Sequence, residues 1–178
     1  SFYIIPKRAI AFITPDRDDF CIGDTLDVSV ELISIPTVDL LISIDSGMTY
    51  VPLATGINTW PYGLLLDSSF LNVTTFLKAR NAADNVELIS DPFRVHALPD
   101  VQSEEPVIGC ANEILFVEAT GANAYTWSPA SIIAEPYARF SNVYTDSSQY
   151  VYVQGTDVYG CTNIDSLYLT VYPVSLDT

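Results

Sequence analysis

The stretch DTLDVSVEL at residues 24–32 alternates apolar and polar side chains with a period of two. In a β-strand this pattern sends the four aliphatic residues to one face and the polar residues to the other. The alternation returns at residues 38–44 (VDLLISI), and a tight turn at residues 45–47 leads into a hairpin with residues 49–53. Apolar residues do not recur at helical spacing over three turns in any window, so the chain is predicted to be all-β.

Similar strand patterns restart in the second half of the chain, at residues 114–119, 124–130, 150–154 and 167–172. Each half opens with a cysteine placed just before its first strand, Cys21 in the first and Cys110 in the second. This duplication predicts two tandem β-sandwich modules. We predict a linker or module end at residues 1–8, modules at 9–96 and 105–173, a linker at 97–104, and a linker to a following module at 174–178.

Charge narrows the classes of function. The chain has 7 Lys and Arg against 22 Asp and Glu, a net charge of -15 at pH 7. Nucleic acids and anionic lipids bind proteins through Lys and Arg, so neither is an expected partner. Apolar runs stay well short of the roughly 20 residues that span a bilayer, so membrane insertion is not expected. The chain begins with Ser1, and we expect it to be a piece of a longer protein.

Several segments carry a family resemblance. Residues 38–50 (VDLLISIDSGMTY) and 90–95 (SDPFRV) resemble immunoglobulin- and fibronectin-type repeats of bacterial surface proteins. The match departs from that pattern at Ser46, where the repeats have glycine, and at Tyr50, where they have tryptophan. Residues 110–130 (CANEILFVEATGANAYTWSPA) and 150–171 (YVYVQGTDVYGCTNIDSLYLTV) resemble the PKD-like and immunoglobulin-like repeats of Bacteroidota cell-surface proteins.

The resemblance implies a fold and a role. The fold is two tandem immunoglobulin-like (fibronectin III/PKD-like) β-sandwiches. The role is a non-catalytic structural or adhesive segment of a large extracellular surface protein or filament, exported by the type IX system. Expected partners are neighbouring repeats of the same chain, further copies in an oligomer or fibre, and a cell-surface glycan or protein. The alternative is a carbohydrate- or protein-binding module attached to a secreted enzyme.

The cysteines suggest a disulfide in the second module. Cys110 precedes an early strand and Cys161 lies at the final hairpin, so we predict that they meet at one end of the sandwich and form a disulfide. A zinc site is the alternative, but two cysteines and the distant His96 supply too few ligands. Cys21 then has no partner within its module, and we interpret it as a small buried side chain or as half of an intermolecular disulfide.

Aromatic residues are the candidate contact groups. Trp127 and Tyr125 share one face of a strand, and Trp127 is predicted to be the core tryptophan of the sandwich. Period-two alternation places the tyrosines of the last hairpin on the outward face, opposite an aliphatic core. The candidate interface or ligand-contact residues are Tyr150, Tyr152, Tyr168 and Tyr172, together with Trp60 and Tyr62 in a loop-like segment of the first module.

The remaining candidates concern metals and modification. Calcium is the candidate cofactor for the acidic residues, and it needs six to eight converging oxygen atoms. The carboxylates that could supply them are Asp16, Asp18 and Asp19 near the first module's entry and Asp100, Glu104 and Glu105 near the linker. Thr25 and Ser166 lie in Asp-Thr/Ser-aliphatic patterns that resemble O-glycosylation sites of exported Bacteroidota proteins. The lone His96 has no nucleophile at a recognisable spacing, and we expect no enzymatic activity.

Overall fold

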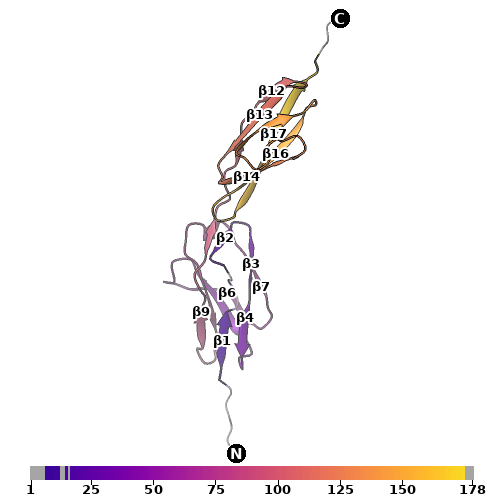
Figure 1. Cartoon of the computed structure of the whole chain (residues 1–178). Helices are drawn as coiled ribbons and strands as arrows, with labels where there is room; N and C mark the ends of the chain where they lie inside the picture. Colours follow the sequence, from indigo (N-terminus) through magenta and orange to yellow (C-terminus); the bar gives the residue numbers. More distant parts are fainter. Residues whose placement is uncertain (1–6, 13–14, 16, 175–178) are drawn as a thin grey trace, which may run out of the picture. The chain divides into compact units, whose positions relative to one another are not determined.

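The structure, a computed structural model, describes residues 7–12, 15 and 17–174. The chain divides into two compact units, Ser1–Ala97 and Leu98–Thr178, called domain 1 and domain 2 below. Regular structure in the described residues consists of strands and one short 3-10 helix, Ser68–Phe70 (Figure 1). The predicted all-β class is therefore confirmed.

The described part of domain 1 contains ten strands that enclose one apolar core. Its largest sheet has the order β6-β5-β8-β9, and three two-stranded ladders, β1-β4, β3-β7 and β10-β2, complete the domain. The strands are β1 (Ala9–Phe12), β2 (Asp19–Cys21), β3 (Thr25–Val28), β4 (Val30–Ile33), β5 (Val38–Ser43), β6 (Val51–Ile57), β7 (Tyr62–Leu65), β8 (Phe76–Arg80), β9 (Glu87–Ile89) and β10 (Arg94–His96).

The alternating stretch that predicts the first strand forms two strands in the structure. Leu26, Val28 and Val30 are buried as expected, but the strand breaks at Ser29. On one side of the break β3 pairs with β7, and on the other side β4 pairs with β1. The side-chain alternation survives this change of partner because both halves face the same core.

A short turn with specific hydrogen bonds follows β5. Gly47 has φ +86°, a conformation that glycine adopts without strain. The Asp45 carboxylate accepts hydrogen bonds from the backbone N–H of Thr49 at 2.9 Å and from its hydroxyl at 2.5 Å. Ser43 Oγ donates a further bond to Asp45 at 2.7 Å. These bonds from Thr49 and Ser43 lower the pKa of Asp45 from 3.8 to about 2.

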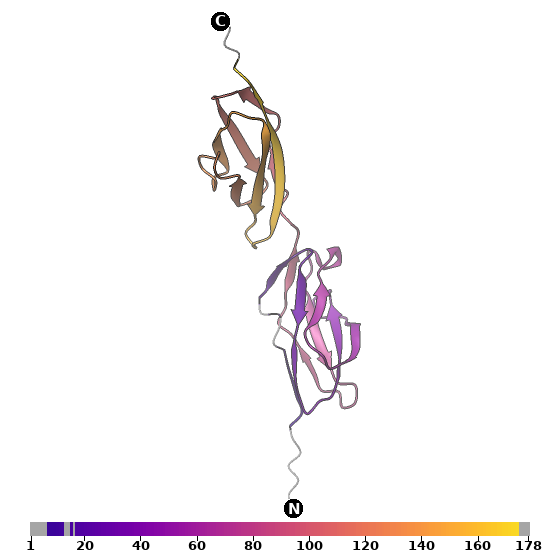
Figure 2. The ribbon, with the colours of Figure 1, turned by 90° about the vertical axis from the view of Figure 1, so that its right-hand side faces the viewer.

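Domain 2 is a smaller sandwich of two sheets with the orders β12-β17-β16-β14 and β11-β13-β15. Its longest strand, β17, lies antiparallel beside β16 and is the long yellow arrow of Figure 2. The strands are β11 (Gln102–Ser103), β12 (Val107–Cys110), β13 (Ile114–Thr120), β14 (Ala124–Ser128), β15 (Phe140–Tyr144), β16 (Gln149–Thr156) and β17 (Thr162–Tyr172).

The core of domain 2 centres on Trp127, which is 1 % exposed. Its indole N–H donates a hydrogen bond to the carbonyl of Ala138 at 2.9 Å, so the ring is buried without an unpaired donor. Tyr125, two residues earlier, is buried on the same face. Both placements confirm the period-two prediction for this strand.

The predicted linker at residues 97–104 needs correction. Val101 is buried in the core of domain 2, and β11 pairs with Thr120 and Ala119 of β13. Gly121 permits this close approach, since a Cβ atom there would lie 1.7 Å from the Asp100 carbonyl oxygen. Most of this stretch is therefore part of the second sandwich, which begins earlier than residue 105.

Candidate binding surfaces

The outward face of the four-stranded sheet in domain 2 carries a cluster of tyrosines. Tyr150, Tyr152 and Tyr168, called the tyrosine face below, are 55, 47 and 43 % exposed. Tyr150 lies opposite Tyr168 in the antiparallel ladder, with ring centroids 4.9 Å apart. The rings of Tyr150 and Tyr152 stack at 6.3 Å. Tyr172, the last residue of β17, is exposed as well.

The same strands bury their alternate residues. Val151, Val153, Leu167 and Leu169 are fully buried, as the sequence pattern predicts. Along the described part of β14, β16 and β17 the outward positions between the tyrosines hold uncharged residues, among them Thr126, Ser128, Gln154, Ser166 and Thr170. An uncharged aromatic surface on a chain of net charge -15 is suited to contact with another surface, because these outward strand positions contribute no carboxylate.

The second sheet of domain 2 has an exposed apolar face that sequence reasoning missed. Phe116 on β13 and Phe140 on β15 stack with centroids 6.0 Å apart. Ile114 and Tyr144, which lie opposite each other in the same ladder, are also exposed. The sequence signal that could have revealed this face is Glu118. A charged residue is expected to point outward, and alternation then places residues 114 and 116 on the same outward face. Ile114, Phe116, Phe140 and Tyr144 are called the phenylalanine face below.

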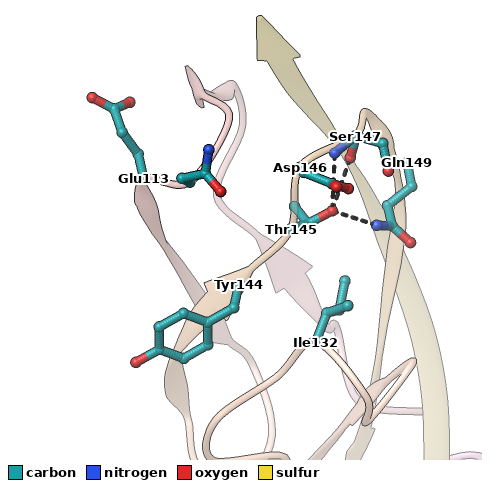
Figure 3. A pocket seen from close by; sticks show the side chains of 8 residues that line it. Glu113, Ile132, Tyr144, Thr145, Asp146, Ser147 and Gln149 are labelled. Atoms are coloured by element: carbon teal, nitrogen blue, oxygen red, sulfur yellow. Dashed lines mark hydrogen bonds between the residues drawn. The ribbon is translucent and has the colours of Figure 1, made fainter. Parts of the chain in front are cut away.

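An open polar hollow of about 580 Å³ lies at one end of domain 2 (Figure 3). Within its wall, Thr145 Oγ1 accepts hydrogen bonds from Gln149 Nε2 at 2.7 Å and from Ser147 N at 3.3 Å. In Figure 3 the Tyr144 ring and the Glu113 carboxylate point away from this loop. Thr145, Ser147 and Gln149 thus bind one another, and the aromatic ring does not converge with them on a common ligand position.

Trp60 and Tyr62 do not form the exposed platform that the sequence suggested. Both side chains are partly buried and pack against the core of domain 1. Tyr62 belongs to β7, whose alternation brings Leu64 into the same core. For Tyr62 the prediction took a strand for a loop, because Pro61 and Gly63 beside it are typical of turns. Trp60 does lie in a bend before β7, but its ring packs on the core.

The predicted Cys110–Cys161 disulfide is wrong, because Cys110 is a free, exposed cysteine and Cys161 is disulfide-bonded, as is Cys21. The geometry explains the error. β12 runs parallel to β17, with Cys110 beside Tyr172 at the end of β17 and Cys161 just before its start at Thr162. Ten residues of strand separate these positions by about 33 Å, whereas a disulfide requires Cα atoms within about 7 Å.

The acidic candidates that the structure describes do not converge on a calcium site. Among the residues that the structure describes, no three His, Cys, Asp or Glu side chains form a group able to hold a metal ion. Asp19 instead contacts His96, with 2.6 Å between Oδ1 and Nε2, and Glu105 accepts a hydrogen bond from the backbone N–H of Tyr168 at 3.1 Å. Asp16 lies outside the described residues.

The two candidate O-glycosylation residues are accessible. Thr25 on β3 and Ser166 on β17 are both exposed. Each lies within a paired strand, opposite Leu65 and Tyr152 respectively. Modification at either position stays a prediction.

No family model matches the chain, and no curated protein matches it. Matches among solved structures include Drosophila N-cadherin EC1-4, with 14% identity over 95% of this chain and 50% of that chain and a TM-score of 0.35. Sidekick-1 immunoglobulin domains 1-4 match with 14% identity, 96% and 49% coverage and a TM-score of 0.37. A 1.5-MDa bacterial ice-binding adhesin matches with 15% identity, 96% and 64% coverage and a TM-score of 0.39.

The chain spans about half the length of the first two of these structures. Likeness at this level of identity and TM-score does not assign a function. Separately, none of the described helical residues form a helix long and apolar enough to cross a membrane.

Proposed function

We propose that this chain is a non-catalytic structural or adhesive segment of a large secreted cell-surface protein or extracellular filament of a Bacteroidota-like bacterium. The tyrosine face of domain 2 is its contact surface toward neighbouring repeats or copies. The observation that carries the proposal is the uncharged, exposed cluster of Tyr150, Tyr152 and Tyr168. The sequence resemblance supports the extracellular, type IX-exported setting.

Tyrosine suits such a contact. Its ring offers a large apolar area with only two side-chain torsions to immobilise, and its hydroxyl remains available for hydrogen bonds. The ring contacts within the face already restrict Tyr150 between Tyr152 and Tyr168. Less side-chain entropy is therefore lost when a partner covers the face.

The size of the face sets the expected strength. The four strands of this sheet have 4, 11, 8 and 5 residues. At spacings of about 4.8 Å and 3.3 Å their outward face covers roughly 450 Å² per copy, and two such faces bury about 900 Å². Specific interfaces bury about 1,200 Å² or more, so one pair of faces should associate weakly. Repetition along a longer chain would raise the effective affinity through multivalency.

Sedimentation of the full chain tests the proposal. Because Cys110 is exposed and free, the experiment is run in the Cys110→Ser background, so that disulfide-linked dimers do not count. We expect concentration-dependent association that the pair Tyr152→Ser and Tyr168→Ser weakens at least about 10-fold without loss of the β circular dichroism signal.

The matched control removes two other exposed tyrosines, Tyr137 and Tyr144, by the same substitution. Equal weakening by the control pair would contradict a specific tyrosine face. A monomer at the highest concentration reached would contradict self-association.

The alternative, a carbohydrate- or protein-binding module on a secreted enzyme, finds less support in the structure. Trp60 and Tyr62 pack on the core, and Thr145, Ser147 and Gln149 of the hollow in Figure 3 bind one another. Glycan-array binding that is lost with the Tyr152→Ser and Tyr168→Ser pair would favour this alternative over the self-contact.

A further inference from the structure

A groove of about 760 Å³ lies on the side of domain 2 where the chain passes from one sheet to the other. β11 belongs to the β13 sheet, whereas β12 pairs with β17 in the opposite sheet. β12 is the outer strand of its sheet, and β13 continues beyond its short pairing with β11. Two strand edges therefore flank the groove, which favours an extended occupant.

Apolar side chains line part of the groove. Ile108, Ile114 and Phe116 each have more than half of their surface exposed. The groove is closed beneath them by Leu115, since a Cβ atom at Gly109 would lie only 2.3 Å from the Leu115 side chain. The groove thus offers apolar contact along its length over a packed floor.

Four glutamates line the same groove: Glu104, Glu105, Glu113 and Glu118. Glu118 is paired with Arg139 at 2.9 Å. Glu105 and Glu113 accept hydrogen bonds from the backbone N–H groups of Tyr168 and Cys110, and such bonds leave the carboxylate charge in place. The groove therefore has three negative charges without a cationic partner among the described residues.

We propose that this groove binds an extended segment of a partner protein that presents Lys or Arg side chains beside aliphatic ones. A metal ion is not the occupant, because these carboxylates do not converge as coordination requires. Lys and Arg side chains are long and flexible, so each can reach a separate carboxylate while the neighbouring apolar side chains contact Ile108, Ile114 and Phe116.

A second copy of this chain is a poor occupant. Five of its seven Lys and Arg side chains already take part in ion pairs: Arg8, Arg17, Lys78, Arg80 and Arg139. The second copy also has 22 Asp and Glu residues, whose negative charges would repel the glutamates of the groove. Charge complementarity therefore points to a different, basic protein, which contacts residues other than the three tyrosines of the tyrosine face.

Three fluorescent peptides test this proposal against the full chain by anisotropy. The probe is a capped heptapeptide that alternates lysine and valine, and the two comparison peptides alternate lysine with serine and glutamate with valine. We expect the lysine–valine peptide to bind best and its affinity to fall as salt rises from about 50 to about 500 mM, because the contacts are partly exposed.

The groove variant is the pair Glu104→Gln and Glu113→Gln. Glutamine at position 113 keeps an acceptor for the Cys110 N–H, and the Glu104 side chain makes no hydrogen bond or ion pair among the described residues. We expect affinity to fall about 5- to 10-fold. The control pair, Glu31→Gln and Asp91→Asn, removes the same charge from exposed positions of domain 1 and should change affinity less than about 2-fold.

A further variant, Phe116→Ser, should also weaken the lysine–valine peptide but leave the lysine–serine peptide unchanged. Three results would overturn the proposal: equal loss in the control pair, equal affinity for the lysine–valine and lysine–serine peptides, or no binding of the lysine–valine peptide at millimolar concentration. If the double variant is unfolded by circular dichroism, Glu104→Gln alone tests the same contact with roughly half the effect on the logarithm of the affinity.

Discussion

The described aromatic rings of domain 1 are buried or partly buried, whereas most of those in domain 2 are exposed to solvent. In domain 1 Phe20, Phe70 and Phe93 are buried, and the remaining described aromatic residues are partly buried. In domain 2 Trp127 and Tyr125 are the buried rings. The exposed rings of domain 2 are Phe116, Tyr137, Phe140, Tyr144, Tyr150, Tyr152, Tyr159, Tyr168 and Tyr172.

The two domains also differ in charge. Six of the seven Lys and Arg residues lie in domain 1 and only Arg139 lies in domain 2. Domain 1 accordingly has cross-strand ion pairs on its sheet, such as Lys78–Glu87 at 3.5 Å. The outward face of the large sheet in domain 2 has uncharged residues between its tyrosines.

This contrast shows that fold class does not determine surface use. Both domains solve the problem of burying a core between sheets with the same period-two alternation. The domains differ at the alternate strand positions that point outward, where core packing does not restrict the choice of side chain. In domain 1 these outward positions hold charged side chains that form ion pairs. In domain 2 many of them hold aromatic side chains, which are suited to contact with another surface.

The sharpest test of the contrast compares a buried ring with an exposed one in the same domain. Trp127→Ala should destabilise domain 2 by about 3–5 kcal/mol, because it removes the largest core side chain and leaves a cavity. Phe116→Ala should change stability by less than about 1 kcal/mol, since its ring is half exposed.

Differential scanning calorimetry measures both variants. We expect the Trp127→Ala effect to appear in the domain 2 transition, while the domain 1 transition stays in place. Similar losses for the two variants would mean that the exposed rings belong to the core, and the comparison of surfaces would fail.

The cysteines give the next largest effect. Cys161→Ser should destabilise the chain by about 2–4 kcal/mol through loss of a disulfide. Cys110→Ser should have little effect, because Cys110 is exposed and free. Peptide mapping without reduction should recover Cys21 and Cys161 oxidised and Cys110 alkylated. An alkylated Cys161 in the native protein would contradict the observed cysteine states.

Alternation in the sequence was sufficient to predict which residues of β16 and β17 are buried. Val151 and Leu167 face the core and Tyr150 and Tyr168 face outward, because neighbouring positions in a strand meet opposite environments. The same rule missed β15, where Ser141 is buried and accordingly interrupts the apolar pattern. Its hydroxyl accepts a hydrogen bond from the backbone N–H of Glu135, which makes this burial possible.

Features that depend on which strands pair with each other could not be predicted from the sequence pattern. The break at Ser29 reflects a change of neighbour, from β7 to β1, that leaves the alternation intact. The cysteine pairing failed for a similar reason, since it depends on β12 lying parallel to β17. The groove beside β12 depends on the same crossover between sheets, so local patterns around Glu104 and Glu113 did not reveal it.

The smallest expected effect is a difference in acid sensitivity between the domains. In domain 1 the pKa values of Asp45, Asp67 and Asp84 are all lowered, chiefly by side-chain hydrogen bonds from Thr49, Ser69 and Arg8 respectively. In domain 2 burial opposes ionisation of Asp165, but hydrogen bonds from Ser103 outweigh it and lower its pKa. The described part of domain 1 thus has more carboxylates of this kind than domain 2.

A lowered pKa in the folded state gives stability that is fully present above the unfolded pKa and is lost as pH falls through the folded pKa. For Asp45 this window runs from its ordinary value of 3.8 down to about 2. Thermal melts at pH 5, 4, 3 and 2 should therefore show the domain 1 transition falling more steeply than that of domain 2. Asp45→Asn should flatten the domain 1 slope between pH 4 and pH 2, because asparagine does not titrate, whereas Asp91→Asn, at an exposed position, serves as the matched control. Equal slopes in the two domains would contradict the difference in acid sensitivity. An unchanged slope in Asp45→Asn would show that the turn after β5 contributes nothing to the acid response.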